Sequence, residues 1–246
     1  MSELYPFDNT THEVAFNARP NSDKPLIVHH RLRRPTIGEL QDREKMLSLE
    51  MIENGREEQI ITHEEAANSN LWDKIVTDVK GYKGFNDWTP LDAQGKASVR
   101  PSHKSVAIRA MYLGSATIVS DDEEVSITAN NWTVRHTIGA DPDNPLYEIF
   151  HTMREPSQIE HQKFKNTASK MSIIRGAKNP RTKIAQDLRA YADLYDALIQ
   201  DVSGATVGGK TWDESNRQGF VSAIDPVWKR MVVQTLMSTI DAALLD

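Results

Sequence analysis

The chain has 246 residues, of which 39% are hydrophobic, and its 29 basic and 35 acidic side chains give a formal net charge of −6. This acidic balance excludes a general basic surface for nucleic acid or anionic lipid, and the absence of cysteine excludes disulfides, thiol nucleophiles and cysteine-ligated metal centres. Because no apolar run approaches the roughly 18 residues of a membrane-spanning helix and the acidic start does not resemble a signal peptide, we expect a soluble, intracellular protein.

The first expected elements along the chain are an arm and two strands. The arm, residues 1–9, carries Tyr5 and Phe7 among polar residues, which predicts either a strand added to a neighbour or the first strand of its own unit. An alternating apolar pattern that begins at Val14 predicts a half-buried strand, and the run LIVHHRL at 26–32 predicts a second one. The Asp-Lys-Pro sequence between them is typical of a turn, so we expect a hairpin.

The residues that follow the hairpin predict the start of a helix. Pro35 and Thr36 are followed by Glu39, which is the pattern of a capping box. In this motif the hydroxyl accepts a hydrogen bond from the third helical amide, while the glutamate accepts one from the amide of the capping residue. Further on, Pro101 is expected to open the last helix of this half, because a proline is tolerated at the first helical position.

The same order of elements returns in the second half, which predicts a tandem duplication of a unit of about 120 residues. HHRLRRPTIGEL at 29–40 matches FHTMREPSQIEH at 150–161, and NLWDKIVTDVKGY at 70–82 matches DLYDALIQDVSGA at 193–205. The matched pairs that specify the fold are Pro35 and Pro156, Thr36 and Ser157, Glu39 and Glu160, Gly81 and Gly204, Trp88 and Trp212, and Pro101 and Pro226. We expect an α+β fold with one repeat over residues 1–120 and another over 121–246, joined near 119–124, each a β-hairpin followed by about three helices.

The central helix is clearest in the second half, where apolar residues recur at steps of three or four: Ile184, Leu188, Tyr191, Tyr195, Leu198 and Val202. Gly204 stands where a C-terminal cap belongs, so the helix is predicted to run up to this residue. Trp88 and Trp212 are interpreted as anchors of the two cores, although aromatic residues are also favoured at interfaces.

The segment from Gly204 to Thr211, with Lys210, matches the P-loop pattern that cradles phosphates. A P-loop works between a buried strand and a helix, whereas this segment follows an expected amphipathic helix. The matched loop of the first half, residues 81–88, lacks the pattern. We therefore favour a flexible glycine-rich loop and expect no cofactor, while keeping a nucleotide-binding enzyme as a remote alternative.

Three repeated polar pairs invite interpretation as acid–base groups: His30 and His151, Arg33 and Arg154, and Glu39 and Glu160. The capping box explains the glutamates better, and the odd spacing of histidine and arginine along a strand points them to opposite faces. We therefore expect no catalytic residues.

The histidines and acidic runs do not form a recognisable metal-binding pattern either. His29 and His30 are adjacent, and 63–65 (His-Glu-Glu) lacks the second histidine of a zinc motif. The run 121–124 (Asp-Asp-Glu-Glu) lacks the glycine and ligand spacing of a calcium loop, so it is interpreted as a solvated linker, and no metal is expected.

One local basic cluster stands out against the acidic composition. Arg31, Arg33 and Arg34 lie together on the second expected strand, next to two histidines, and are a possible partner contact. The corresponding residues of the second half do not keep this charge, which favours a solvated strand edge instead.

The motif strand–Leu/Met-Arg-x-Pro-Thr/Ser-x-x-Glu–helix resembles segments of small structural and tail-assembly proteins of tailed bacteriophages. The run Leu-Tyr-Asp-Ala-Leu-Ile-Gln-Asp-Val-Ser-Gly at 194–204, followed by Pro-x-x-Lys at 226–229, resembles the same proteins. The resemblance implies a non-enzymatic virion component of the tail, neck or capsid decoration, located in the virion or, during assembly, in the bacterial host cytoplasm. The alternative is an assembly chaperone that binds a virion protein transiently. Either way we expect protein partners or self-association, and no membrane, nucleic acid or small-molecule substrate.

Overall fold

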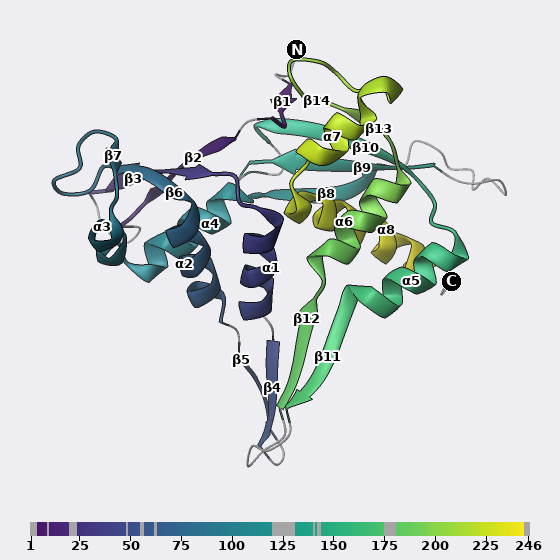
Figure 1. Ribbon diagram of the computed structural model, residues 1–246, viewed down its shortest axis with the longest axis horizontal. Helices are drawn as coiled ribbons and strands as arrows, with labels where there is room; N and C mark the ends of the chain where they lie inside the picture. Colours follow the sequence, from purple (N-terminus) through teal and green to yellow (C-terminus); the bar gives the residue numbers. More distant parts are fainter. Residues whose placement is uncertain are drawn as a thin grey trace. The chain divides into compact units, whose positions relative to one another are not determined.

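The computed structural model of the chain contains both helices and sheets, which confirms the α+β class (Figure 1). It describes residues 4–8, 10–19, 24–47, 49–54, 57–61, 63–119, 131–139, 141, 144–174 and 181–243. The expected join near 119–124 lies, from residue 120 on, outside the described residues.

The chain forms two compact units, each built from segments that are separate in the sequence. We call Thr10–Met111 with Ser169–Asp187 the N-terminal unit. Met1–Asn9, Tyr112–Ala168 and Leu188–Asp246 form the C-terminal unit. Residues 1–9 therefore belong to the unit built mainly from the second half of the sequence. Residues 169–187 belong to the unit built mainly from the first half.

The N-terminal unit contains a four-stranded antiparallel sheet with the order β2 (Thr11–Asn17), β3 (Ile27–Arg33), β6 (Val76–Lys80) and β7 (Thr89–Pro90). The expected hairpin is confirmed as β2–β3. Its helices are α1 (Ile37–Met46), α2 (Glu64–Ile75), α3 (Ala93–Ser98) and α4 (Pro101–Met111). Helix α2 packs against both α1 and α4, and its Leu71, Trp72 and Ile75 are buried.

A second sheet of the N-terminal unit consists of two hairpins that come from different halves of the sequence. Its order is β11 (Ser169–Ile174), β12 (Arg181–Gln186), β4 (Leu49–Asn54) and β5 (Glu57–Ile61), all antiparallel. Figure 1 shows the two hairpins side by side, with β12 next to β4. No strand was expected at these four positions from the sequence.

The C-terminal unit also contains a four-stranded antiparallel sheet. Its sheet has the order β13 (Ile199–Ser203), β10 (Tyr147–Arg154), β9 (Asn131–Ile138) and β8 (Gly114–Val119), and β9–β10 is the second expected hairpin. The arm contributes β1 (Tyr5–Pro6), which pairs in parallel with β14 (Ala205–Thr206). The helical elements are α5 (Gln158–Ala168), α6 (Leu188–Leu198), the 3-10 turn η1 (Glu214–Asn216), α7 (Arg217–Ala223) and α8 (Pro226–Ala243).

The local chemistry of the helix starts is as predicted. Thr36 Oγ1 accepts from the Glu39 amide at 3.3 Å, and Glu39 accepts from the Thr36 amide at 2.8 Å, which is a complete capping box. Ser157 and Glu160 make the same two bonds, at 3.3 and 2.8 Å. Pro101 and Pro226 are the first residues of α4 and α8.

The predicted long central helix is wrong in its second half, because α6 ends at Leu198 and the chain continues as strand β13. Ile199 and Val202 are buried while the residues between them are exposed, and β-branched side chains favour a strand that has a partner in the sheet. Ile184 lies in β12 rather than in the helix.

Gly204 ends this strand and does not cap a helix. Its φ is +82°, and a Cβ there would stand 2.1 Å from the backbone oxygen of Glu148. Gly81 occupies the same position after β6, with φ +89° and a Cβ 2.5 Å from the oxygen of Ile27. Both glycines are therefore required by the close approach of the neighbouring strand.

Candidate functional site

The end of the long hairpin strand in each unit is tied to two helices by a paired arginine and glutamate. Arg33 donates to the Glu39 carboxylate at 2.5 and 3.0 Å and to the carbonyl oxygen of Lys74 at 3.1 Å. The Arg33 hydrogen bond, followed by the bonds from Thr36, lowers the pKa of Glu39 to about 2. A carboxylate with so low a pKa is ionised at neutral pH and is poorly suited to proton transfer.

The C-terminal unit contains the same arrangement. Arg154 donates to Glu160 at 2.6 and 2.9 Å and to the carbonyl oxygen of Ala197 at 3.2 Å. The pKa of Glu160 is again lowered to about 2, mainly by the hydrogen bond from Arg154. The repeated arginines and glutamates therefore join a strand, the first helix and the central helix, which is a structural role.

The repeated histidines lie in the interiors of the units. In the N-terminal unit Trp72 Nε1 donates to His30 Nδ1 at 2.8 Å, and His30 Nε2 lies 2.9 Å from the hydroxyl of Tyr82. The same hydroxyl lies 3.2 Å from His103 Nδ1. Because His30 Nδ1 accepts, the neutral ring carries its proton on Nε2 and donates to Tyr82. Burial, together with the nearby His103 and His29, lowers the pKa of His30 to about 3.

In the C-terminal unit His151 lies beside a second buried histidine. His151 Nδ1 lies 2.7 Å from the hydroxyl of Tyr195, and the ring centroid of His136 is 5.7 Å from that of His151. Both nitrogens of His136 and Nε2 of His151 are buried and find no hydrogen-bond partner among the residues that the structure describes. Burial lowers the pKa of His136 to about 4 and that of His151 well below its usual value. Both rings are therefore held neutral.

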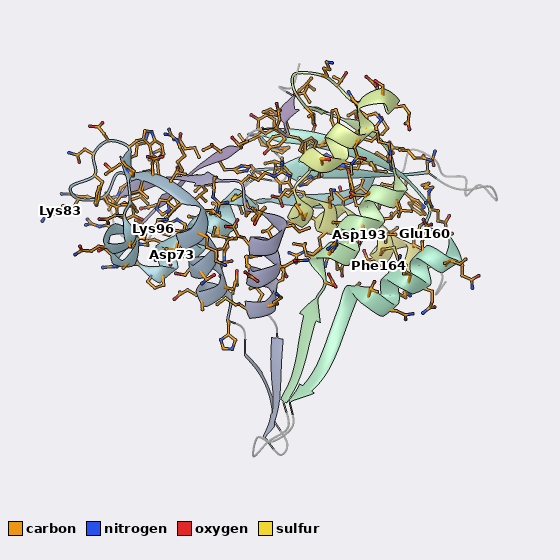
Figure 2. All side chains as sticks on the ribbon, in the orientation of Figure 1. Asp73, Lys83, Lys96, Glu160, Phe164 and Asp193 are labelled. Carbon is orange, nitrogen blue, oxygen red and sulfur yellow. The ribbon has the colours of Figure 1, made fainter. Side chains whose placement is uncertain are left out.

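A lysine and an aspartate link the central and last helices of each unit. Lys104 Nζ lies 2.7 Å from Asp73, whose carbonyl oxygen also accepts from Lys96 at 2.8 Å (Figure 2). In the C-terminal unit the corresponding bond joins Lys229 Nζ to Asp196 at 2.5 Å. These lysines lie in the Pro-x-x-Lys motif, so the motif residues also have a role inside the fold.

Two side chains of the arginine cluster, those of Arg31 and Arg33, have partners within the N-terminal unit. Arg31 stacks over Trp88 with its guanidinium carbon 4.1 Å from the ring centroid and also lies 3.9 Å from Glu13 and from Asp78. Arg33 is held by the ion pair described above, and the Arg34 amide donates to the carbonyl oxygen of Thr10. Trp88 is half-buried under Arg31, whereas Trp212 packs edge-to-face on the buried Phe220.

The glycine-rich segment forms a tight turn and not a phosphate cradle. Val207 and Lys210 exchange backbone hydrogen bonds at 2.9 and 3.1 Å around Gly208 and Gly209, which have φ of +57° and +73°. The Gly208 amide donates to the Asp8 carboxylate at 3.0 Å. This turn does not lead directly into a helix, because η1 and α7 begin only at Glu214 and Arg217. The backbone amides that would face a phosphate are therefore used within the unit.

Two features that the sequence did not reveal are open to a partner. The first is the pair of outer strands of the hairpin sheet, β5 and β11, which pair on one side only among the described residues. The second is a cavity of about 390 Å³ in the N-terminal unit, close to Tyr82 and His103. The aromatic residues of the arm, Tyr5 and Phe7, point to neither feature, because both side chains are buried in the C-terminal unit.

Other site classes find no support in the described part of the chain. Its His, Asp and Glu side chains do not gather in groups of three or more that would hold a metal ion, and the run 121–124 lies outside it. None of its helices is long and apolar enough to cross a bilayer. Comparison with family models, with curated proteins and with solved structures found no match to this chain.

Proposed function

We propose that this chain is a tandem duplication of one α+β unit and that it acts as a structural protein which associates with further copies of itself. The observation that carries the proposal is the pairing of the two long hairpins, in which β12 pairs with β4 and leaves β5 and β11 as edges. The duplication explains how one chain comes to hold both halves of such an interface.

The contacts inside the units support the duplication. Three contacts occur once in each half, on residues 121 to 125 positions apart. They are the Arg–Glu pair that also bonds a helix carbonyl, the Lys–Asp bond, and the close approach of a glycine to the carbonyl oxygen of the neighbouring strand. The strand bulge also recurs, between Arg31 and Leu32 and between Thr152 and Met153. Contacts that match in both partners and geometry favour two copies of one fold over a chance likeness of sequence.

The pairing of the hairpins is of the head-to-tail kind. Each hairpin lies between the first and central helices of its half, so β4 corresponds to β11 and β5 corresponds to β12. A two-fold relation would pair like strands, whereas here the second strand of one hairpin pairs with the first strand of the other. Head-to-tail interfaces continue until a ring closes or a filament grows.

The two edge strands, β5 and β11, can pair with each other between copies in the way that β12 pairs with β4. Strand β5 is a second strand and β11 is a first strand, so pairing of β5 with β11 of another copy repeats the β12–β4 interface. Exposed edges present unpaired backbone N–H and C=O groups that add a strand readily. We therefore propose rings or filaments of this chain linked through the hairpin sheet.

The resemblance to structural and tail-assembly proteins of tailed bacteriophages favours assembly within a phage particle. We propose a virion component of the tail, neck or capsid decoration, present in the particle or, before assembly, in the host cytoplasm, and without catalytic activity. Detection of the chain in purified particles supports the component, and its absence from them favours an assembly chaperone.

The test is the mass of the purified full chain over a concentration series, measured by light scattering and sedimentation. Discrete rings or growing polymers are expected, and a monomer at every concentration contradicts the proposal. The matched variants are Gln59→Pro and Ile60→Pro, adjacent residues of β5 whose amides point to opposite sides of the strand. One of the two prolines removes the amide that faces away from β4, and this variant is expected to lose assembly and keep its fold. The other proline removes the amide that faces β4 and is expected to break the hairpin.

A further inference from the structure

We infer that the cavity of the N-terminal unit is the docking site for residues 121–130 of a second copy of this chain, inserted as the N-terminal arm is inserted in the C-terminal unit. The inference rests on the proposed self-association and names the segment that would make the contact.

The N-terminal arm shows how such a segment is held. The Tyr5 amide donates to the carbonyl oxygen of Gly204 at 3.0 Å, and the Phe7 amide donates to that of Thr206 at 2.9 Å. The backbone of the arm therefore adds a short parallel strand just beyond the glycine that ends β13.

The side chains of the arm occupy an aromatic pocket of the C-terminal unit. Only 8% of Tyr5 and 2% of Phe7 is exposed. The Tyr5 ring lies edge-on to Tyr147 and Trp228, with centroids 5.0 and 5.1 Å away, and Phe7 lies 6.3 Å from Phe220. Three side chains, from β10, α7 and α8, thus form the walls around the arm.

The counterparts of these three walls line the cavity of the N-terminal unit. Under the register of the matched glycines, prolines and lysines, Tyr147 corresponds to Leu26, Phe220 to Gly95 and Trp228 to His103. Leu26, Gly95 and His103 all border the cavity of about 390 Å³, as does Tyr82, the residue after Gly81. The position that the arm fills in one unit is therefore hollow in the other.

The sequence contains one further segment of the same register. Val125 and Ile127 lie 120 residues after Tyr5 and Phe7 and keep their spacing. In the proposed duplication the arm of the first repeat enters the unit of the repeat that follows it. The segment 121–130 begins the second repeat. In a head-to-tail assembly the second repeat of one copy is followed by the first repeat of the next copy, so this segment would enter the N-terminal unit of that next copy.

Charge complementarity favours this occupant. Val125 is preceded by the four acidic residues at 121–124, whereas Arg19, Lys83 and Arg100 border the cavity and are exposed. Lys83 extends from the loop before β7 into solvent (Figure 2). The N-terminal arm, by contrast, has a single acidic residue before Tyr5, and no comparable run. An acidic segment therefore complements the charge of the cavity's border.

The experiment is a fluorescence anisotropy titration of a labelled peptide with the sequence of residues 119–130 against the full chain carrying Val125→Asp and Ile127→Asp. These changes remove competition from the chain's own segment. Saturable binding is expected, and the same peptide with both aspartates is the matched control that fails to bind. Lys83→Glu and Arg100→Glu, both at exposed positions, are each expected to weaken binding about two- to fivefold, and less so at high salt.

The outcomes separate this inference from the proposed function. If the unaltered chain assembles but the peptide does not bind, the docking site is refuted while self-association stands. If the peptide binds and Val125→Asp with Ile127→Asp lowers the assembly state of the full chain, the inference is confirmed. If the unaltered chain is a monomer and only the altered chain binds the peptide, the segment occupies its own cavity and the second copy is refuted.

Discussion

Moderate acid is expected to destabilise both units, because each buries histidines in their neutral form. His30 in the N-terminal unit and His136 and His151 in the C-terminal unit are fully buried, and the pKa of each is lowered mainly by burial. An unfolded chain binds protons at these residues with a pKa near 6.5. The unfolded state therefore gains protons below pH 6.5 while the folded state does not, so the free energy of unfolding decreases as the pH falls.

The size of the effect follows from the pKa values. The folded pKa is about 3 for His30 and about 4 for His136, so both remain neutral at pH 5. At that pH the unfolded histidine is 1.5 pH units below its pKa of about 6.5, which costs about 2 kcal/mol for each buried ring. Burial also lowers the pKa of His151, so this ring adds to the loss of stability of the C-terminal unit as the pH falls. Glu39 and Glu160 contribute only below about pH 4.5, where their unfolded forms take up protons.

The measurement is urea unfolding at several pH values between 7.5 and 5, followed by tryptophan fluorescence at low protein concentration. His136→Leu is expected to remove about 2 kcal/mol of the loss at pH 5, because within the described part of the chain neither ring nitrogen of His136 has a hydrogen-bond partner to lose. His63→Gln, at an exposed position before α2, is the control and keeps the full loss. Equal unfolding free energies at pH 7.5 and 5, or a His136→Leu variant with an unchanged pH dependence, would refute the reasoning.

Three further predictions concern single residues. Gly204→Ala is expected to destabilise the chain by about 2 kcal/mol or more in thermal unfolding, because its Cβ would meet a backbone oxygen at 2.1 Å, while Gly208→Ala, with open space around it, costs about 1 kcal/mol. Arg154→Met is expected to cost about 1 kcal/mol at pH 7, and the difference from the unaltered chain should decrease below pH 4.5 and vanish near pH 2, where Glu160 of the folded chain becomes protonated. Lys210→Ala is expected to leave stability unchanged, and ATP binding that depends on this lysine in calorimetry would instead restore the P-loop interpretation.

The elements that the sequence predicted correctly are those with local chemical signals. The capping boxes at Thr36 and Ser157 and the proline-led helix at Pro226 depend on side chains within a few residues of each other. The two hairpins of alternating residues could be predicted for the same reason. Such signals place the start of an element well, because the groups that satisfy its first amides are close in sequence.

The remaining elements depend on partners far away in the chain. Ile199 and Val202 are three residues apart, a spacing that suits a helical face as well as a bulged strand, and pairing with β10 decides for the strand. Strands β4, β5, β11 and β12 mix polar and apolar residues without clear alternation, and β12 finds its partner more than a hundred residues earlier. Nothing local in the sequence distinguishes such segments from loops.

Under the proposed duplication, several contacts that build the fold recur in both repeats, whereas the position that binds the arm differs between them. The Arg–Glu, Lys–Asp and glycine contacts recur in both units, whereas Phe220 and Trp228 are replaced by Gly95 and His103 at the cavity. The segment that begins the second repeat differs as well, with Val125 and Ile127 at the positions of Tyr5 and Phe7 in the arm. Different interfaces, one within a copy and one between copies, would produce such a change in both the pocket and the segment that enters it. That pairing would keep the interfaces distinct and so help each repeat find its proper neighbour during assembly.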